Sequence, residues 1–263
     1  MRLFWIITVV SVNILELFLF ANNSPAFAID ETSTSATQLI GQPDFTTNVS
    51  RLKGYWNPES ILQIGTKVLI GEACRISVYN SAPTTTYQAR DYVIGSPNRN
   101  TTCVYSGPEA KSMIDPRGLA FDGTRLFTAD WQFNRILIYN TLPTTNVATA
   151  NMVLGQPNMT SSTANNGGLS ASSLSEPRAI DVSGGKLLVA DRSNNRVLIW
   201  NTIPTTDNQA ADVVLGQPNM TSSTANNGGI TAHSLYQPNG VAVVNGKLYI
   251  SDSGNNRDRK SVV

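Results

Sequence analysis

Few residues of this sequence are suited to metal or nucleophilic chemistry. The 263-residue chain contains one histidine, His233, and two cysteines, Cys74 and Cys103. These are too few for a His/Cys zinc site with four ligands or for a CxxC redox pair. A Ser-His-Asp triad could be built only on His233, and the sequence contains no G-x-S-x-G, HExxH, Walker or EF-hand motif. We therefore expect no catalytic residue, metal site or cofactor in this sequence.

Polar residues at a regular spacing are better candidates for a binding site. Glu59, Arg117, Arg178 and Asn239 each follow a proline and lie about 60 residues apart. If the strands that begin at these prolines lie together, the four side chains gather at one mouth of a central channel. The two arginines would then favour an anionic ligand. The alternative is that the arginines only form ion pairs with carboxylates of neighbouring repeats.

An internal repeat of about 61 residues explains this spacing. The segment GQPNMTSSTANNGG occurs at residues 155–168 and again, unchanged, at residues 216–229. Four copies are visible, and the first is the most divergent. Each copy contains a proline, an acidic residue and an arginine in the same order: Pro58, Glu72 and Arg75; Pro116, Asp130 and Arg135; Pro177, Asp191 and Arg196; and Pro238, Asp252 and Arg257.

Each copy has the pattern of four short β-strands. In the third copy an apolar stretch follows Pro177, and then come KLLVAD (186–191), RVLIWN (196–201) and ADVVLGQP (211–218). Short runs rich in Val, Ile, Leu and Tyr between Gly, Asn and Pro are typical of strands. We therefore predict an all-β fold, a β-propeller present as an incomplete arc of about four blades of four antiparallel strands. The blades are predicted at residues 58–97, 116–157, 177–218 and 238–257, the last of them truncated.

Three turns of the repeat carry a family resemblance. The segments Asp130–Arg135, Asp191–Arg196 and Asp252–Arg257 resemble the core signature of the NHL-repeat family, as does the opening Pro238–Ala242. The resemblance implies a propeller, usually of six blades, whose proline-led strand is innermost. The GQP-containing repeats look similar to those of secreted bacterial NHL-type proteins. Residues repeated in every blade suit a structural role, so we interpret these as holding the blades together: Asp130, Asn134, Arg135, Asp191, Asn195, Arg196, Asp252, Asn256 and Arg257.

The histidine and the cysteines lie in loops or turns of the repeat. His233 occupies a position that holds Ser172 in the preceding copy, which indicates an ordinary loop residue. Cys74 stands where later copies have a turn asparagine, and Cys103 follows about 30 residues later. An oxidising compartment would favour a disulfide between the two cysteines, but their Cα atoms must lie within about 7 Å. The sequence leaves both the bridged and the free state open.

The first 28 residues resemble a secretory signal. The apolar run Leu3–Leu15 is followed by Ala26-Phe27-Ala28, which supplies the small residues that a signal peptidase needs. Glu16 argues against a membrane anchor, because an acidic group at bilayer depth costs about 2.5 kcal/mol or more. We expect cleavage near Ala28 and a secreted, periplasmic or cell-surface protein with no membrane span in the mature chain.

Two further segments lie outside the four blades. Residues 29–57 are expected to contain an outer strand at Gln38–Pro43 that closes the ring by completing the last blade. Residues 258–263 break the apolar pattern of a third strand, and we interpret them as a sequencing-adapter artefact. The fourth blade would then lack a neighbour. Four of its apolar residues are expected to be uncovered: Val241, Val243, Leu248 and Ile250.

The charge balance narrows the choice of partner. With 19 Lys and Arg against 18 Asp and Glu, the formal net charge is +1, so we expect no nucleic-acid partner. We expect an exported binding or scaffold module for an unknown protein or polysaccharide. Two alternatives stay open. One is a propeller enzyme of the lyase or lactonase type whose catalytic residues lie in missing blades, and the other is a structural repeat array on the cell surface.

Overall fold

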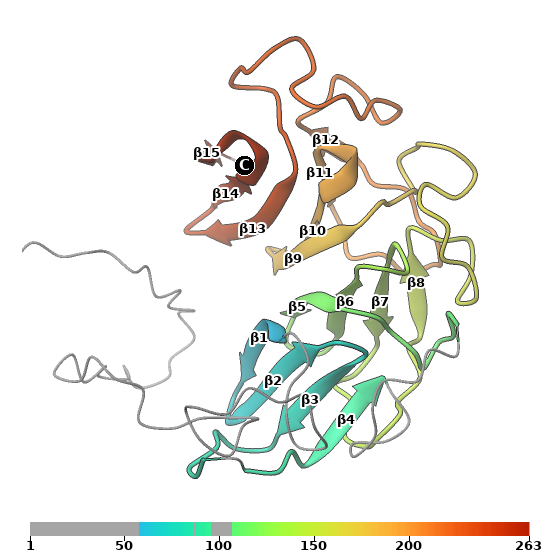
Figure 1. Cartoon of the computed structure of the whole chain (residues 1–263), viewed down its shortest axis with the longest axis vertical. Coiled ribbons are helices and arrows are strands. Elements are labelled where there is room, and N and C mark those ends of the chain that lie inside the picture. Colours follow the sequence, from blue (N-terminus) through green and yellow to red (C-terminus); the bar gives the residue numbers. More distant parts are fainter. Residues whose placement is uncertain (1–57, 87, 96–106, 263) are drawn as a thin grey trace, which may run out of the picture. The chain divides into compact units, whose positions relative to one another are not determined.

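The fold is described from a computed structural model, which defines residues 58–86, 88–95 and 107–262. These residues form four antiparallel sheets (Figure 1), and their only helices are two single 3-10 turns. No helix among them is long and apolar enough to cross a membrane. The predicted all-β fold of four blades in a propeller arrangement is therefore confirmed.

Each blade is a meander in which every strand pairs with the next one along the chain. Blade 1 consists of β1 (Pro58–Ile64), β2 (Lys67–Glu72), β3 (Arg75–Tyr79) and β4 (Tyr92–Gly95). Blade 2 consists of β5 (Pro116–Phe121), β6 (Leu126–Asp130), β7 (Arg135–Tyr139) and β8 (Met152–Leu154). Blade 3 consists of β9 (Pro177–Ser183), β10 (Lys186–Asp191), β11 (Arg196–Trp200) and β12 (Val213–Leu215). Blade 4 consists of β13 (Pro238–Val244), β14 (Lys247–Asp252) and β15 (Arg257–Val262). The 3-10 turns η1 (Arg192–Asn194) and η2 (Ser253–Asn255) join the second and third strands of blades 3 and 4.

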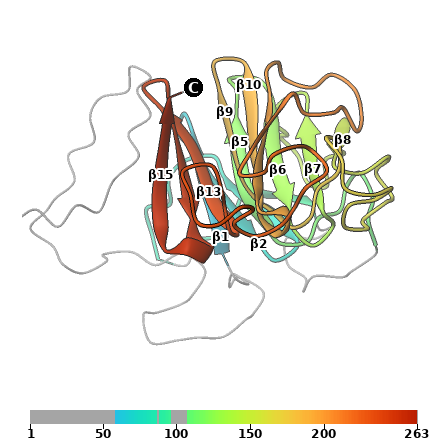
Figure 2. The same cartoon turned by 90° about the horizontal axis from the view of Figure 1, so that it is seen from above.

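The strand that begins at a proline is the inner strand of each blade. β1 packs against β5, β5 against β9, and β9 against β13, while the other strands of each blade follow outward (Figures 1 and 2). The inner strands approach closely, because a Cβ added at Gly118 of β5 would lie 3.0 Å from the carbonyl oxygen of Arg178 in β9. This close packing brings the first residues of successive inner strands near one another.

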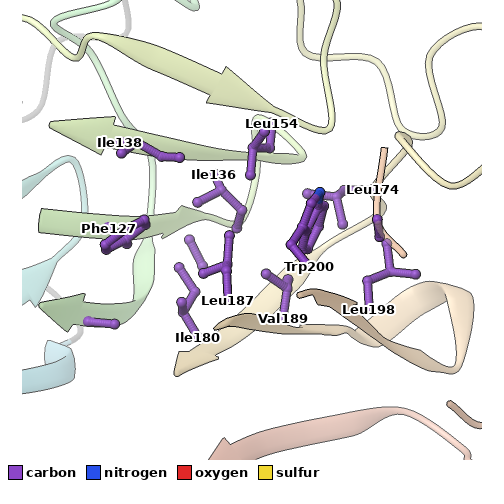
Figure 3. Packing of buried hydrophobic residues seen from close by; sticks show 13 residues of the cluster. Phe127, Ile136, Ile138, Leu154, Leu174, Ile180, Leu187, Val189, Leu198 and Trp200 are labelled. Atoms are coloured by element: carbon purple, nitrogen blue, oxygen red, sulfur yellow. The ribbon is translucent and has the colours of Figure 1, made fainter. Parts of the chain in front are cut away.

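The core lies between the faces of neighbouring blades. Alternate residues of a strand point to opposite faces, so blades 2 and 3 each contribute one apolar face to the blade before and one to the blade after. Between blades 2 and 3, Phe127 and Ile138 meet Leu187 and Val189 (Figure 3). Trp200 completes this layer with 1% of its surface exposed, and its indole N–H donates to the carbonyl of Gln209 at 3.0 Å.

The expectation that the apolar residues of blade 4 are uncovered is wrong. Val241, Leu248 and Ile250 are 8%, 0% and 4% exposed, because they point toward blade 3. Val243 is partly buried against the same cluster. The outward alternation of β14 instead exposes Tyr249, at 38%.

The segment interpreted as an adapter artefact continues the sheet of blade 4. The backbone of β15 pairs with β14 along its whole length, from Arg257 opposite Asp252 to Val262 opposite Lys247. Asp258 is exposed, whereas Ile136 and Val197, the residues that follow the signature arginine in β7 and β11, are fully buried. Thus β15 pairs with the second strand of its blade as β7 and β11 do, but the residue after its signature arginine is charged and exposed, where β7 and β11 have a buried apolar residue.

We predict that Trp200→Ala lowers the free energy of unfolding by about 3–5 kcal/mol, because it opens a cavity between blades 2 and 3. Tyr249→Ala, which removes an exposed aromatic ring from blade 4, should cost less than about 1 kcal/mol. Urea denaturation of both variants measures the difference. Equal losses for the two substitutions would contradict a core located between blades.

Candidate functional site

A buried ion pair fixes the turn of blade 3. Arg196, which has no exposed surface, donates from Nε to Asp191 Oδ2 at 2.7 Å. Its Nη2 reaches the carbonyls of Ser170 and Ser173 at 3.0 and 2.8 Å, and its Nη1 reaches that of Met220 at 2.6 Å. Arg196 therefore ties the loop that enters its blade and the loop that leaves it to the same turn.

Blade 2 repeats this arrangement. Arg135 donates from Nε to Asp130 Oδ2 at 2.8 Å and from Nη1 to the carbonyl of Met159 at 2.6 Å. Its Nη2 donates to the carbonyls of Glu109 and Ser112 at 3.0 and 2.9 Å. The two arginines make equivalent contacts although the loops before them differ in sequence, because they bond backbone carbonyls and not side chains.

The aspartates of these pairs are fully buried, which affects their protonation. Burial raises the pKa of Asp130 to about 6, although Arg135 and the backbone N–H of Ile114 stabilise its carboxylate. Burial likewise raises the pKa of Asp191 above its ordinary value. Because a pKa of about 6 is still below neutral, Asp130 is mainly ionised at pH 7 and its ion pair with Arg135 is formed.

The last asparagine of the turn connects one blade to the next. Asn134 and Asn195 have left-handed φ angles of 52° and 53°, a conformation that asparagine tolerates. Asn134 Oδ1 accepts the backbone N–H of Glu176 at 2.8 Å, and Asn195 Oδ1 accepts that of Gln237 at 2.9 Å. Glu176 and Gln237 directly precede the prolines that begin the next inner strands. These contacts therefore set where each following inner strand starts.

The connections from blade 2 to blade 3 and from blade 3 to blade 4, here called the GQP loops (residues 155–176 and 216–237), have two further anchors. Gln156 Nε2 donates to the carbonyls of Asn134 and Thr163, both at 2.9 Å, and Gln217 makes the equivalent bonds in the second loop. Asn165 also exchanges two hydrogen bonds, of 2.8 and 2.9 Å, with Asn194 in the turn of blade 3. Sequence reasoning did not assign these roles, although the repeated GQP and NN were visible signals.

Blade 1 replaces the signature pair with a different one. Its acidic residue, Glu72, accepts a bond from Arg90 Nη1 at 2.5 Å and lies 3.4 Å from Arg75 Nε. Cys74, in the same turn, is disulfide-bonded. The sequence left the bridged and the free state of Cys74 and Cys103 open, and Cys103 lies outside the described residues.

Three of the four predicted binding residues come together at the start of the inner strands. Arg117 Nη2 lies 3.8 Å from Glu59 Oε1, and Arg178 Nη2 lies 3.7 Å from Glu59 Oε2. The three side chains belong to three different blades, and between 14% and 28% of each is exposed. The arginines thus pair with a carboxylate of another blade, which was the alternative considered from the sequence.

The fourth predicted residue, Asn239, is hydrogen-bonded to Arg192, a residue that the sequence analysis did not single out. Arg192 donates from Nε to Asn239 Oδ1 at 3.0 Å and from Nη2 to Gln237 Oε1 at 2.9 Å. Its Nη1 bonds Glu176 Oε2 at 3.2 Å. The position after the signature aspartate varies between blades, and that variation was the available signal. Asp115 and Trp131 lie next to Arg117 in the same region. We call the whole group the inner-strand cluster: Glu59, Asp115, Arg117, Trp131, Glu176, Arg178, Arg192, Gln237 and Asn239.

The arginines of the inner-strand cluster lie close enough to repel one another. Burial, with the positive charges of Arg117 and Arg192, lowers the pKa of the Arg178 guanidinium, while Glu59 and Glu176 oppose that shift. The guanidinium of Arg117 stacks 3.8 Å from the centroid of the Trp131 ring. Among the described residues, the buried atoms Arg117 Nε and Trp131 Nε1 have no hydrogen-bond partner. The inner-strand cluster therefore retains unused donors.

The residues suited to metal or nucleophilic chemistry do not assemble into a site in the part of the chain that the structure describes. No group of three or more His, Cys, Asp or Glu side chains placed to hold a metal ion occurs there. His233 is exposed, and its backbone N–H bonds Thr231 Oγ1 at 3.1 Å.

Comparison with known proteins supports the repeat assignment. Residues 235–257, which include the turn of blade 4, match the NHL repeat family. No curated protein was found that matches this chain.

Solved structures show only distant likeness. Glutaminyl cyclase of Myxococcus xanthus is 11% identical with a TM-score of 0.41, over 73% of this chain and 60% of that one. The designed protein Ika4 is 8% identical with a TM-score of 0.43, over 81% of this chain and 95% of that one. A putative 6-phosphogluconolactonase from Bacteroides uniformis is 16% identical with a TM-score of 0.38, over 77% of this chain and 55% of that one. We draw no functional conclusion from likeness at this level.

We predict that Asn134→Ala lowers the free energy of unfolding by about 2–3 kcal/mol, because it leaves the backbone N–H of Glu176 and the carbonyl of Ser162 without their partner. Asn256→Ala is the matched control. Asn256 has a similar φ of 51°, is exposed, and makes no side-chain hydrogen bond within the described residues. Chemical denaturation of both variants should separate the lost bonds from the shared backbone effect. If both variants lose the same free energy of unfolding, Asn134 does not stabilise the contact between blades.

Proposed function

We propose that this protein is an exported binding module, in which the propeller is a scaffold and the two GQP loops present a repeated polar surface to a protein or polysaccharide. The observation that carries the proposal is the duplication of the loop in both sequence and conformation. The match to the NHL repeat supports the scaffold part, because such propellers commonly bind proteins. The signal-like residues 1–28 support export, and they lie outside the described residues.

The tips of the two loops have the same hydrogen bonds. Asn158 Oδ1 accepts the backbone N–H and the hydroxyl of Thr160 at 3.0 and 2.9 Å and the hydroxyl of Ser161 at 3.0 Å. Asn219 makes the same three contacts, with Thr221 and Ser222, at 3.0, 3.0 and 2.9 Å. Both asparagines are exposed. The two copies thus offer the same polar groups in the same local geometry.

The loops are also held rigidly at their bases. Gln156, Asn165 and Arg135 bond the first loop to the blades, as described above, and the second loop has the same contacts from Gln217, Asn226 and Arg196. A loop that is already ordered loses little conformational entropy on binding. Two equal sites on adjacent blades also increase the avidity for a partner with repeated units. Both effects favour a binding surface over a chain that merely connects blades.

Substitution in the two GQP loops, next to their tips, tests the proposal. Thr163 and Thr224 are exposed, equivalent residues whose side chains make no hydrogen bond within the described residues. The double variant Thr163→Lys, Thr224→Lys should abolish binding to partners found by glycan arrays and by cross-linking on the surface of producing cells. Each single variant should retain weaker binding, because one intact loop remains.

The control is Thr144→Lys, an exposed position in the loop between β7 and β8. This variant should bind like the wild type, and all variants should melt at the same temperature. A double variant that binds as well as the wild type would show that the GQP loops are connectors only.

A further inference from the structure

The arginines of this protein fall into two groups that differ in how their donors are used. A guanidinium has five N–H donors. Arg135 and Arg196 each make four hydrogen bonds to described residues. Arg117 and Arg178 donate no hydrogen bond to any described residue, and only 14% and 28% of their side chains are exposed to water. The second pair therefore has donors that are partly removed from water and not used by the fold.

Arg117 and Arg178 both face the carboxylate of Glu59, at a distance too long for hydrogen bonding. The Glu59 oxygens lie 3.8 Å from Arg117 and 3.7 Å from Arg178. Charge-assisted hydrogen bonds between these groups are about 2.7–2.9 Å long. Glu59 of blade 1 thus offsets the positive charges of Arg117 in blade 2 and Arg178 in blade 3, but it accepts a hydrogen bond from neither arginine.

Neighbouring groups hold Arg117 in place and leave further donors free. Stacking on Trp131 at 3.8 Å fixes the plane of its guanidinium. Arg117 Nε and Trp131 Nε1 are buried without a partner among the described residues, and a buried donor without a partner is costly. Asp115 Oδ2 is also 3.8 Å from Arg117 and is too far away to accept a hydrogen bond. Because 14% of the Arg117 side chain is exposed, an acceptor supplied from outside can approach its other donors.

We propose that Arg117 and Arg178 form a binding site for the carboxylate group of a small organic acid, in which Glu59 is an internal competitor. A planar carboxylate matches the fork of a guanidinium and can accept bonds from both arginines. The inner-strand cluster has equal numbers of basic and acidic groups: Arg117, Arg178 and Arg192 against Glu59, Asp115 and Glu176. A monoanion therefore suits it better than a phosphate dianion. This site is separate from the tips of the GQP loops and does not depend on their function.

Trp131 provides a direct reporter for the test. The indole N–H signal of Trp131 in a ¹H–¹⁵N spectrum of the full chain is assigned with Trp131→Phe. The chain is then titrated with propionate, with its neutral analogue propionamide, and with inorganic phosphate. We expect a saturable shift of the Trp131 signal with propionate, none with propionamide, and a weaker response to phosphate.

Variants separate the roles of the three residues. Glu59→Gln removes the competing charge and should strengthen propionate binding by about tenfold. Arg178→Gln should weaken it by about tenfold, and this side chain can be changed without loss of a hydrogen bond to the described residues. The control Arg125→Gln removes an arginine whose only ion pair among the described residues is with Asp122, in the turn between β5 and β6, and this variant should bind propionate like the wild type.

Three results would overturn the proposal. One is an equal response to propionate and propionamide, another is a response to phosphate as strong as that to propionate, and the third is unchanged propionate binding in both Glu59→Gln and Arg178→Gln. The melting temperature of each variant is measured alongside, so that a loss of binding in an unfolded protein is not counted as support.

Discussion

The buried ion pair between the aspartate that ends a second strand and the arginine that begins the third is the constraint on which blades 2 and 3 depend. Neither Asp191 nor Arg196 has any exposed surface, and removing such charges from water is costly. The cost is offset only if most of the remaining donors and acceptors are used. Arg196 meets that requirement through the carbonyls of two loops, and Asp191 through the backbone N–H of Ser175. The pair thus determines the path of the chain between blades.

The positions of the loops and of the inner-strand cluster follow from this pair. Because the turn is fixed, Asn195 can reach the backbone N–H of Gln237 and set the start of β13. The residue after each proline is then placed beside its counterparts in other blades, where Glu59 meets Arg117 and Arg178. Positions that are the same in each blade carry the fold, and neighbouring positions that vary between blades are free to build a single binding site.

The sequence was sufficient to predict the blades and the gathering of the residues that follow the prolines, because both depend on a short periodic pattern. It did not reveal that Arg90 compensates for the change to Glu72 in blade 1, since Arg90 has no charged counterpart in the other copies. It also misplaced the exposed face of blade 4. Whether Leu248 or Tyr249 faces blade 3 depends on which side of the sheet the neighbour covers, and alternation alone does not specify that side.

A double-mutant cycle on Asp191 and Arg196 tests the central claim most directly. The free energies of unfolding of Asp191→Ala, Arg196→Ala and the double variant are measured by urea denaturation. Each single substitution should cost about 3–5 kcal/mol, because it leaves one buried charge without its partner. The double variant should lose much less than the sum of the two, with a coupling of about 2–3 kcal/mol. Additive losses would contradict the account, because they would mean that the two residues stabilise the turn independently and not as an ion pair.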